Sequence, residues 1–595
     1  MNNMRNSKVG GRTFSKPKNK KKTLKRLGIY ISQFKWWFII ALILTVISNA
    51  CALVGPMLSG YAIEAIEKGK GAVDFEQVFF YAILMIIFYI ISTILSFILS
   101  LLMIKISKKI IYRLRKDCFD SLMRLPVSYF DHNLSGDIIS KMSYDIDTVN
   151  TSLSSDIIHI CTALITVVGS FVMMLIISPL LTLIMVITIP ISLLFTRFML
   201  KRTHKLFKKR SVTLGKLNGY VEEMISGNKV IKAYGVEDNI VSGFNIENEE
   251  AVDAAYRAEY YGSITGPGVN FVNNLSLALI CAFGSILYIF AKIGLMKISS
   301  FILYSRKFSG PINEVANIFV DIQSALAAAE RVFSLIDEEK EQEDDINSIE
   351  LNEVLGNVRF SNVKFGYNPN HLIIKDLSFE ALSGKTIAIV GPTGAGKTTI
   401  VNLLMRFYDI DDGTITLDDY SLYTIKRKCV RNAYAMVLQD TWLFEGSVFD
   451  NIAYGMDNVT REDVERVARA AHIHNFIMGL PNGYDTIITE DGINISKGQK
   501  QLLTIARAML LDAKMLILDE ATSNVDTRTE IKIQQAMATL MKGKTCFIIA
   551  HRLSTIQNAD LILVVNNGNI IEKGTHKDLL DKKGFYYELY NSQFD

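Results

Sequence analysis

Apolar residues gather in long runs in the first half of the chain and in short runs in the second half. Six mostly apolar stretches lie at about 37–58, 79–104, 156–177, 179–200, 268–291 and 298–322. A helix needs roughly 20 apolar residues to cross the hydrocarbon core of a bilayer. The sixth stretch is the weakest match because it contains Arg306, Lys307, Glu314 and Asp321. No comparable run follows residue 330, so the pattern predicts six membrane helices followed by a water-exposed part.

Positive charge is concentrated in two of the connections between these stretches. The connections 105–155 and 201–267 hold most of the loop lysines and arginines, and the short connections hold few. Because cytoplasmic loops carry the excess of Lys and Arg, both long loops and both termini are expected in the cytoplasm. Apolar residues recur within these loops at three- and four-residue spacing, which predicts helices that continue out of the membrane and turn near 128–137 and 222–232. Two independent soluble inserts are the alternative, which the lack of a strand pattern disfavours.

The second half of the chain has a different pattern. After an acidic stretch at 337–345, short β-like runs such as 386–391 and 514–520 alternate with helical stretches. This alternation predicts an α/β domain with a largely parallel sheet. The predicted organisation is a basic cytoplasmic tail (1–26), a six-helix transmembrane domain with two long cytoplasmic loops (27–335), an acidic linker (336–350) and the α/β domain (351–595).

Composition agrees with a membrane protein and excludes other classes. Of the 595 residues, 49% are hydrophobic and 21% charged, which is far too apolar for a disordered chain. The net charge of +4 hides ten Lys and Arg within residues 1–26, so the remainder is net acidic and a generally basic, nucleic-acid-binding protein is excluded. Six scattered cysteines without a CxxC pair argue against a disulfide framework or a zinc site.

The strongest chemical signal is the sequence GPTGAGKT at residues 391–398. It matches the phosphate-binding loop GxxxxGK[ST] and lies between a predicted strand and a predicted helix. Glycines let backbone N–H groups wrap phosphate oxygens, and the helix N-terminus adds its positive dipole end. Lys397 is expected to reach the β- and γ-phosphates, and the Thr398 hydroxyl to ligate Mg²⁺. The alternative is a plain glycine-rich turn, which this strand–loop–helix context disfavours.

A second signal is the strand MLILDE at residues 515–520, which ends in two carboxylates. Asp519 is suited to hold Mg²⁺ through water, and Glu520 to polarise the attacking water. On its own this is an ordinary strand end with solvated acids. Together with the phosphate loop it predicts a site that binds and hydrolyses ATP.

Between these signals, residues 495–499 (ISKGQ) resemble the LSGGQ signature of ABC transporter nucleotide-binding domains. Motifs resembling the other elements of that family follow in order: FGY with Tyr367, VLQD with Gln439, SNVD with Asp526 and AHRLST with His551. The resemblance implies a domain that binds ATP and Mg²⁺. It implies ATP contacts from Tyr367, Gly391, Pro392, Thr393, Gly394, Ala395, Gly396, Lys397, Thr398 and Thr399, catalytic roles for Glu520, His551 and Gln439, and metal roles for Thr398, Gln439 and Asp519.

The resemblance also implies a dimer and a direction of transport. Ser496, Lys497, Gly498 and Gln499 would contact ATP held by a partner, and Asp526 would belong to the D-loop. Residues 129–150 and 222–238 resemble stretches that bear or adjoin coupling helices. Six membrane segments ahead of one nucleotide domain resemble an exporter half-transporter, most like one subunit of a bacterial heterodimeric multidrug exporter. The implied function is ATP-driven export of small amphipathic molecules, drugs or lipids, across the cell membrane.

The signature departs from the family pattern at two positions, where Ile495 replaces leucine and Lys497 replaces the first glycine. This departure favours a heterodimer in which Glu520 serves a competent site and Lys497 faces a weaker one. The alternatives are a homodimeric lipid or peptide exporter that tolerates the variant and, from another class, a non-transporting regulator or ATP-gated channel on the same scaffold.

Polar residues inside the apolar stretches mark a candidate substrate cavity. Asn270, Asn273 and Asn274 are spaced to share one helix face. Intramembrane charges usually face protein or water, so Arg306, Lys307 and Glu314 join them as candidates. The alternative is hydrogen bonding or ion pairing between helices without any ligand contact.

Overall fold

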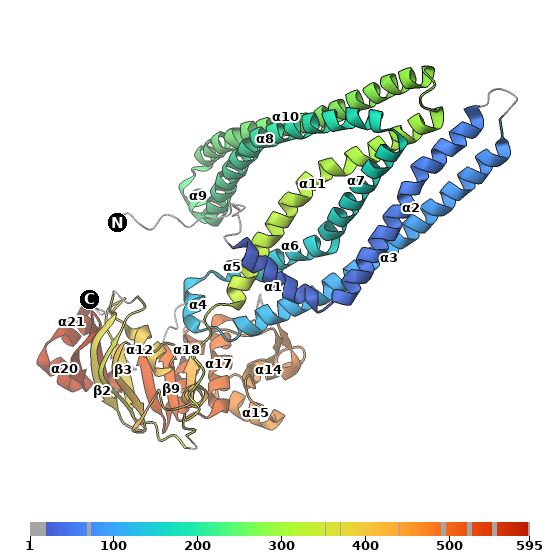
Figure 1. The fold of residues 1–595 in the computed structure, drawn as a ribbon. Coiled ribbons are helices and arrows are strands. Elements are labelled where there is room, and N and C mark those ends of the chain that lie inside the picture. Colours follow the sequence, from blue (N-terminus) through green and yellow to red (C-terminus); the bar gives the residue numbers. More distant parts are fainter. Residues whose placement is uncertain are drawn as a thin grey trace. The chain divides into compact units, whose positions relative to one another are not determined.

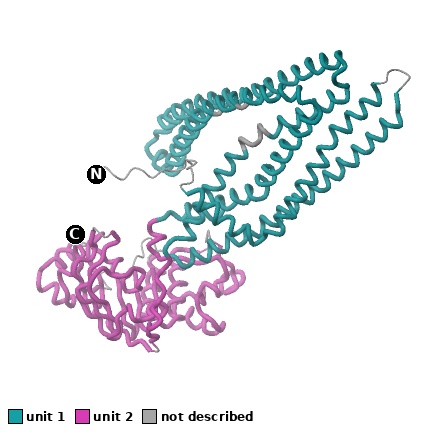
Figure 2. The backbone as a smooth tube through the Cα atoms, in the orientation of Figure 1, with its two compact units in different colours: residues 1–125, 133–339 teal, residues 126–132, 340–595 magenta. Residues whose placement is uncertain are grey.

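A computed structural model describes residues 19–67, 73–351, 353–368, 371–438, 441–489, 495–519, 526–549 and 556–592. The chain divides into two compact units (Figure 2). Unit 1 comprises residues 1–125 and 133–339, and unit 2 comprises residues 126–132 and 340–595. The division at 339/340 falls inside the acidic stretch, and most of the basic tail lies outside the described residues.

Unit 1 is helical, and every predicted membrane stretch falls largely within one of its long helices (Figure 1). These helices are α2 (Lys35–Glu67), α3 (Phe75–Leu122), α7 (Ile157–Ile177), α8 (Pro179–Ser226), α10 (Glu237–Ile289) and α11 (Leu295–Ile336). Shorter helices complete the unit: α1 (Lys20–Ser32), α5 (Ser135–Ser140), α6 (Ile146–Thr151) and α9 (Asn228–Tyr234). Two π-helical turns, Lys141–Asp145 and Ser152–Asp156, join α5, α6 and α7.

The longest helices exceed the thickness of a bilayer. Helices α3 and α8 have 48 residues each and α10 has 53, which at a rise of about 1.5 Å per residue gives lengths of roughly 70–80 Å. They therefore continue past the hydrocarbon core, as the spacing within the two long loops predicted. Among the described residues, five helical segments are long and apolar enough to cross a membrane, and α11 is not one of them.

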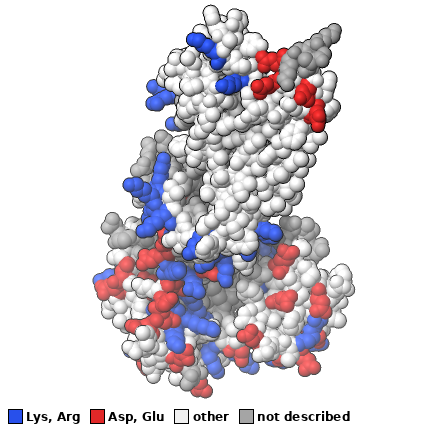
Figure 3. Space-filling view, turned by 45° about the vertical axis from the view of Figure 1, so that its right-hand side comes forward, with Lys and Arg blue, Asp and Glu red and all other residues white. Residues whose placement is uncertain are grey.

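The surface of unit 1 reflects this apolar composition. Large hydrophobic side chains along α2 and α3 are half exposed, among them Ile43, Ile47, Ile90 and Phe97. In Figure 3 the long helices of unit 1 show a broad belt of uncharged side chains, with charged side chains near the tips of the helices. Such a belt is expected of helices whose outer faces contact lipid.

Helices α7, α8, α10 and α11 share a tightly packed core. Its fully buried members include Met174, Met185, Ile280, Phe301 and Tyr304. Two of the longest helices, α8 and α10, run side by side, as do α2 and α3 (Figure 1). The packing of Phe301 and Tyr304 against three apolar helices places this part of α11 at the same level as the membrane-crossing segments, despite its charged neighbours.

Unit 2 is built on one ten-stranded sheet in the order β5-β4-β1-β2-β12-β11-β3-β10-β9-β6. Its strands are β1 (Val358–Phe365), β2 (Ile374–Ala381), β3 (Thr386–Val390), β4 (Asp412–Leu417), β5 (Tyr420–Ser421), β6 (Tyr434–Val437), β9 (Met515–Asp519), β10 (Thr545–Ile549), β11 (Leu561–Asn566) and β12 (Asn569–Gly574). A separate pair consists of β7 (Gly446–Ser447) and β8 (Ile487–Ile488).

The large sheet is mixed: five of its nine strand pairings are parallel and four are antiparallel, so the predicted parallel arrangement holds mainly for the half from β11 to β6. Strands β11, β3, β10, β9 and β6 are mutually parallel, whereas β1 pairs antiparallel with both β2 and β4. The parallel strands are almost wholly buried and form continuous apolar runs. Strand β2 alternates buried and exposed residues, so its sequence, IKDLSFEA, gives no such run.

Helices cover both faces of this sheet. They are α12 (Lys397–Leu404), α13 (Arg427–Asn432), α14 (Val448–Ile452), α15 (Arg461–Ala470), α16 (His474–Met478), α17 (Lys497–Leu511), α18 (Thr527–Met541), α20 (His576–Lys582) and α21 (Phe585–Ser592). Along β3, Ile387 and Ile389 pack into the same cluster as α12, whereas Ala388 and Val390 pack into the cluster that contains α17 and α18. The period-two alternation of a strand thus builds two cores.

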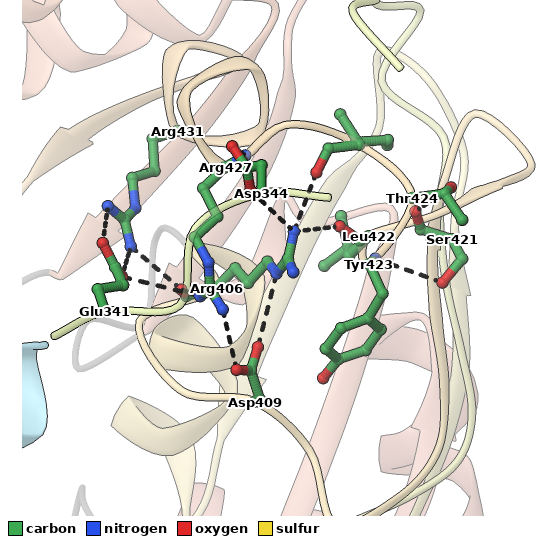
Figure 4. A network of polar contacts seen from close by, with 11 residues as sticks. Glu341, Asp344, Arg406, Asp409, Ser421, Leu422, Tyr423, Thr424, Arg427 and Arg431 are labelled. Atoms are coloured by element: carbon green, nitrogen blue, oxygen red, sulfur yellow. Dashed lines mark hydrogen bonds and ion pairs between the residues drawn. The ribbon is translucent and has the colours of Figure 1, made fainter. Parts of the chain in front are cut away.

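The acidic linker is attached to unit 2 by an arginine cluster (Figure 4). Arg427 and Arg406 are 7% exposed, and their guanidinium groups lie beside Asp409 at 2.9 and 3.5 Å. The linker supplies two further carboxylates. Glu341 pairs with Arg431, and Asp344 accepts the backbone N–H of Arg427 at 3.0 Å.

Arg406 holds this cluster in place. Its guanidinium donates to the carbonyls of Leu422 (2.8 Å) and Ile425 (2.9 Å) and lies 4.9 Å from the ring centre of Tyr423. Its backbone has a φ of +50°, in the left-handed region that side chains disfavour. The side-chain contacts therefore offset a local backbone cost.

Replacing Arg406 with alanine should destabilise unit 2. The change leaves buried carbonyls without donors and removes a cation from a largely buried ion-pair cluster, at a cost of about 3 kcal/mol. Thermal unfolding of the full chain in detergent should show a clearly lowered transition. The matched control is Arg359→Ala, because the Arg359–Glu380 pair is solvent-exposed and contributes little. Equal effects of the two changes would contradict a structural role for the cluster.

Candidate nucleotide-binding site

The predicted phosphate loop joins β3 to α12. Gly394 and Gly396 have φ angles of +82° and +106°, which only glycine adopts readily. The Lys397 side chain folds back over the loop, where its Nζ donates to the carbonyls of Gly391 (2.7 Å) and Pro392 (3.0 Å). Burial lowers the pKa of Lys397. The loop therefore has its cation already in place beside backbone that a phosphate would approach.

The two threonines after Lys397 have different surroundings. Thr398 is exposed, whereas Thr399 is 5% exposed and its hydroxyl accepts a weak hydrogen bond from Tyr367 at 3.4 Å. Asn402 of α12 donates to the Tyr367 hydroxyl at 3.0 Å. The phenol end of Tyr367 is thus fixed against α12, and Thr398 presents its hydroxyl to the surface.

Asp519 ends β9, and one strand, β10, separates it from β3. Because these strands are parallel, their carboxyl ends meet at one edge of the sheet, where the phosphate loop begins. The Asp519 carboxylate raises the pKa of Lys397, against the larger effect of burial. The Thr398 hydroxyl and the Asp519 carboxylate are hard oxygen donors at this edge, which is the donor set that Mg²⁺ prefers.

The ISKGQ sequence opens α17 with a reciprocal capping box. The Ser496 hydroxyl accepts from the Gln499 N–H at 3.3 Å, and the Gln499 side chain accepts from the Ser496 N–H at 2.8 Å. Gly498 is buried, whereas Ser496 and Lys497 are exposed. Lys497 therefore leaves the start of the helix intact and adds a positive charge to its exposed end.

Asp526 caps α18 by accepting the Thr529 N–H at 3.0 Å, and these hydrogen bonds hold the pKa of Asp526 below its usual range. Three predicted residues, Gln439, Glu520 and His551, lie outside the described residues. The geometry of the site thus covers the phosphate loop, the end of β9, the signature and the D-loop aspartate.

Tyr408 is a contact residue that the sequence analysis missed. Its ring lies 4.9 Å from that of Tyr367 and 5.6 Å from that of Phe365, both in edge-on arrangements. Its hydroxyl donates to Asp131 of α4 (Val127–His132), the short helix that belongs to unit 2. Burial, followed by the Asp131 hydrogen bond, raises the pKa of Tyr408. The sequence signal that could have pointed to Tyr408 is the aromatic pair Phe407 and Tyr408 shortly after α12.

Arg507 of α17 is a second residue that the sequence analysis missed. Its guanidinium donates to the backbone carbonyl of Asn451 at 2.7 Å and to its side-chain oxygen at 3.2 Å. The ring of Tyr454 lies 5.2 Å away, and burial lowers the pKa of Arg507. The helix that begins at the signature is thereby tied to the segment around α14.

The predicted cavity residues whose side chains the structure describes have different surroundings. Asn273 lines a small cavity with Thr188, Ser192, Ser276 and Ser309, among others. Asn270, Asn274 and Arg306 are exposed, and the Glu314 side chain lies outside the described part. Lys307 instead donates to the carbonyl of Ala52 on α2.

Comparison with known proteins decides the family. Residues 38–312 match the model of the ABC transporter transmembrane region, and residues 374–523 match the ABC transporter model. The chain belongs to the ABC transporter family. This transporter is 42% identical over 588 residues to the uncharacterized ABC transporter ATP-binding protein YfiC of Bacillus subtilis, a match covering 99% of this chain and 97% of the relative.

Two further matches describe the type of ABC transporter. It is 44% identical over 482 residues to a fatty acid ABC transporter ATP-binding/permease protein of Mycobacterium bovis, covering 81% of this chain and 76% of the relative. A solved bacterial Atm1-family ABC exporter with ATP bound matches with a TM-score of 0.75 at 28% identity, covering 94% of this chain and 98% of that chain. The protein is therefore a multi-pass membrane transporter of the exporter type with an ATPase domain.

Tyr408→Phe should separate ATP hydrolysis from transport. The change removes the hydroxyl that donates to Asp131 and keeps the ring that packs on Tyr367. We expect the apparent KM for ATP to stay within about twofold, because the phosphate loop and the ring packing on Tyr367 are unchanged, and the amount transported per ATP to fall.

The measurement is the ratio of vesicle uptake to phosphate release. Asp131→Asn retains an acceptor and is the matched variant, which should be milder. A Tyr408→Phe protein with an unchanged ratio would contradict a role for this hydrogen bond.

Proposed function

We propose that this ABC exporter moves small amphipathic molecules, drugs or lipids, out across the cell membrane, as one half of a dimer. The observation that carries the proposal is the union, in one chain, of an apolar helical unit and an organised phosphate loop. The match to a fatty acid transporter supports an amphipathic substrate. Alternating access would convert ATP binding and release into a change in the side from which the cavity opens.

In the proposed hydrolysis, Lys397 neutralises charge on the β- and γ-phosphates. Thr398, Asp519 and Gln439 are the residues that would hold Mg²⁺, which supplies further charge neutralisation when bound. In this proposal Glu520 would accept a hydrogen bond from the attacking water, His551 would contact the γ-phosphate, and Tyr367 would stack on adenine. Water attacks the γ-phosphorus, the bond to the bridging oxygen breaks, and ADP and phosphate are released.

The dimer we propose places each phosphate loop opposite the partner's signature. The exposed Ser496 and Lys497 at the start of α17 would then lie beside ATP held by the other chain. An added cation there changes the electrostatics of one site, which favours a heterodimer with one strong and one weaker site. A homodimer remains the alternative, because the capping box of α17 is intact.

The substrate cavity is proposed to include Asn270, Asn273, Asn274, Arg306, Lys307 and Glu314. Exposed polar and charged side chains at membrane depth are costly against lipid and are expected to face water or a partner. The small cavity beside Asn273 is lined by three serines and a threonine together with Met185, Ile189 and Val272, a mixed polar and apolar lining that supports an amphipathic substrate.

Glu520→Gln is the direct test of ATP-driven export. The variant should bind ATP normally and lose turnover at the competent site by about a hundredfold or more, because the water loses its base. Inside-out vesicles should accumulate a fluorescent amphiphile against its gradient with the normal chain and not with the variant. A chain that only regulates or forms a channel would show no uphill accumulation, and unchanged hydrolysis by the variant would contradict the role of Glu520.

Expression of the chain alone tests the heterodimer. A chain that needs a different partner should purify with low ATPase activity, which co-expression of the partner restores. Lys497→Gly should then raise hydrolysis at the weaker site. Full, substrate-stimulated ATPase activity from the chain alone would establish the homodimer instead.

A further inference from the structure

Lys307 lies in a polar site that a proline creates inside unit 1. Pro56 lies within α2 and has no N–H, so the carbonyl of Ala52, four residues earlier, loses its helical donor. A carbonyl at membrane depth needs another partner. The Lys307 ammonium of α11 donates to it, and the Tyr304 hydroxyl donates to the next carbonyl, that of Leu53, at 2.6 Å.

A third helix completes this site. The Tyr89 ring of α3 lies 5.8 Å from the Lys307 nitrogen. Its hydroxyl lies where a side chain on Gly55 would be, since a Cβ there would be 2.1 Å from that oxygen. Gly55, which has no side chain, thus leaves room for the Tyr89 hydroxyl. Pro56, which has no N–H, leaves the Ala52 carbonyl to Lys307. We call Ala52, Gly55, Tyr89, Tyr304 and Lys307 the Lys307 site.

The charge of the Lys307 site is not balanced. Lys307 is twelve residues from the start of α11, or about 18 Å along the helix, which is near the middle of a core roughly 30 Å thick. Among the described residues, no carboxylate lies within ion-pair distance of it. Its neighbours are a carbonyl and a phenol ring, which are neutral, and one of its three N–H groups is used by Ala52.

A charged side chain is more than the carbonyl requires. Tyr304 donates to the adjacent carbonyl of α2, that of Leu53, through a neutral hydroxyl, so a donor at this position does not need a charge. An ammonium in the same position costs more to bury and retains donors for another group. The exposed Arg306 next to it adds positive charge at the same level. These groups together make a region of positive potential within the membrane unit.

We infer that Lys307 binds the anionic head group, a carboxylate or phosphate, of the amphiphile that the transporter carries. The inference rests on the proposed function and narrows its substrate class to amphiphilic anions. In this view Pro56 and Ala52 position the ammonium, and the free N–H groups donate charge-assisted hydrogen bonds to the head group. The apolar tail would then contact the neighbouring apolar side chains.

The test compares amphiphiles of equal chain length and opposite charge. ATPase stimulation of the full transporter is measured with dodecanoate, dodecyl phosphate and dodecyltrimethylammonium, and acetate serves as an anion without a tail. We expect half-maximal stimulation by the two dodecyl anions at about tenfold lower concentration than by the cation, which corresponds to one charge-assisted contact. Acetate should have no effect.

Variants at position 307 assign this preference to the site. Lys307→Gln should remove the preference and Lys307→Glu should reverse it, without changing the apparent KM for ATP. Lys307→Arg should retain it. Lys297→Gln is the matched control, because Lys297 is exposed near the start of the same helix and takes no part in the site.

Wild-type protein alone can overturn the inference, whatever the variants do to folding. Equal stimulation of the wild-type protein by anion and cation, or a preference for the cation, overturns the inference. A folded Lys307→Gln protein that keeps the preference for anions also overturns it. If no amphiphile stimulates hydrolysis while Glu520→Gln still abolishes it, the anion site fails and the ATPase assignment stands. Loss of uphill transport of every amphiphile is instead the failure of the proposed function.

Discussion

The hydrogen-bonding demand of a backbone that crosses lipid constrains the structure of unit 1. Water is absent from the hydrocarbon core, so each N–H and carbonyl group needs a partner within the protein. Uninterrupted helices meet this demand over most of the long segments. Where Pro56 interrupts the hydrogen bonding of α2, side chains of α11 donate to its backbone carbonyls. These hydrogen bonds join two helices that are distant in the sequence.

Unit 2 is governed by a different constraint, the shared edge of parallel strands. The carboxyl ends of β3 and β9 fall on one side of the sheet, which brings Lys397 and Asp519 together although 122 positions separate their numbers in the sequence. The antiparallel strands β1, β2 and β4 lie on the other side of the sheet order and carry Tyr367 just beyond β1. In the site we propose, the phosphate contacts of Lys397 and the adenine contact of Tyr367 would come from the two halves of one sheet.

Local sequence was a good guide where local physics decides the outcome. Long apolar runs predicted the membrane helices, and the spacing in the cytoplasmic loops predicted their extensions. GPTGAGKT and ISKGQ predicted a loop and a capped helix start because glycine conformations and capping hydrogen bonds involve near neighbours. The strand β2 was missed because alternating polar residues do not distinguish a half-buried strand from a loop.

Contacts between distant segments were beyond the reach of such patterns. The hydrogen bond from Tyr408 to Asp131 joins positions far apart in sequence, and no spacing rule relates them. Lys307 was singled out as an intramembrane charge, but its partner was not predictable, because the partner is a backbone carbonyl, a group that every residue possesses. Glu341 and Asp344 belong to the acidic stretch that marks the domain boundary, and nothing in that run indicates their arginine partners.

Arg406 inverts the usual ranking of two common substitutions. Alanine is normally the gentler replacement and glycine the harsher one, because glycine loses more conformational entropy on folding. With a φ of +50°, position 406 instead penalises any residue that has a Cβ. Alanine would keep that backbone cost and lose every side-chain contact, whereas glycine would lose the contacts but relieve the cost. Arginine is therefore favourable at position 406 only through its guanidinium contacts. Of the two replacements, we expect glycine to lower the stability of unit 2 less than alanine does.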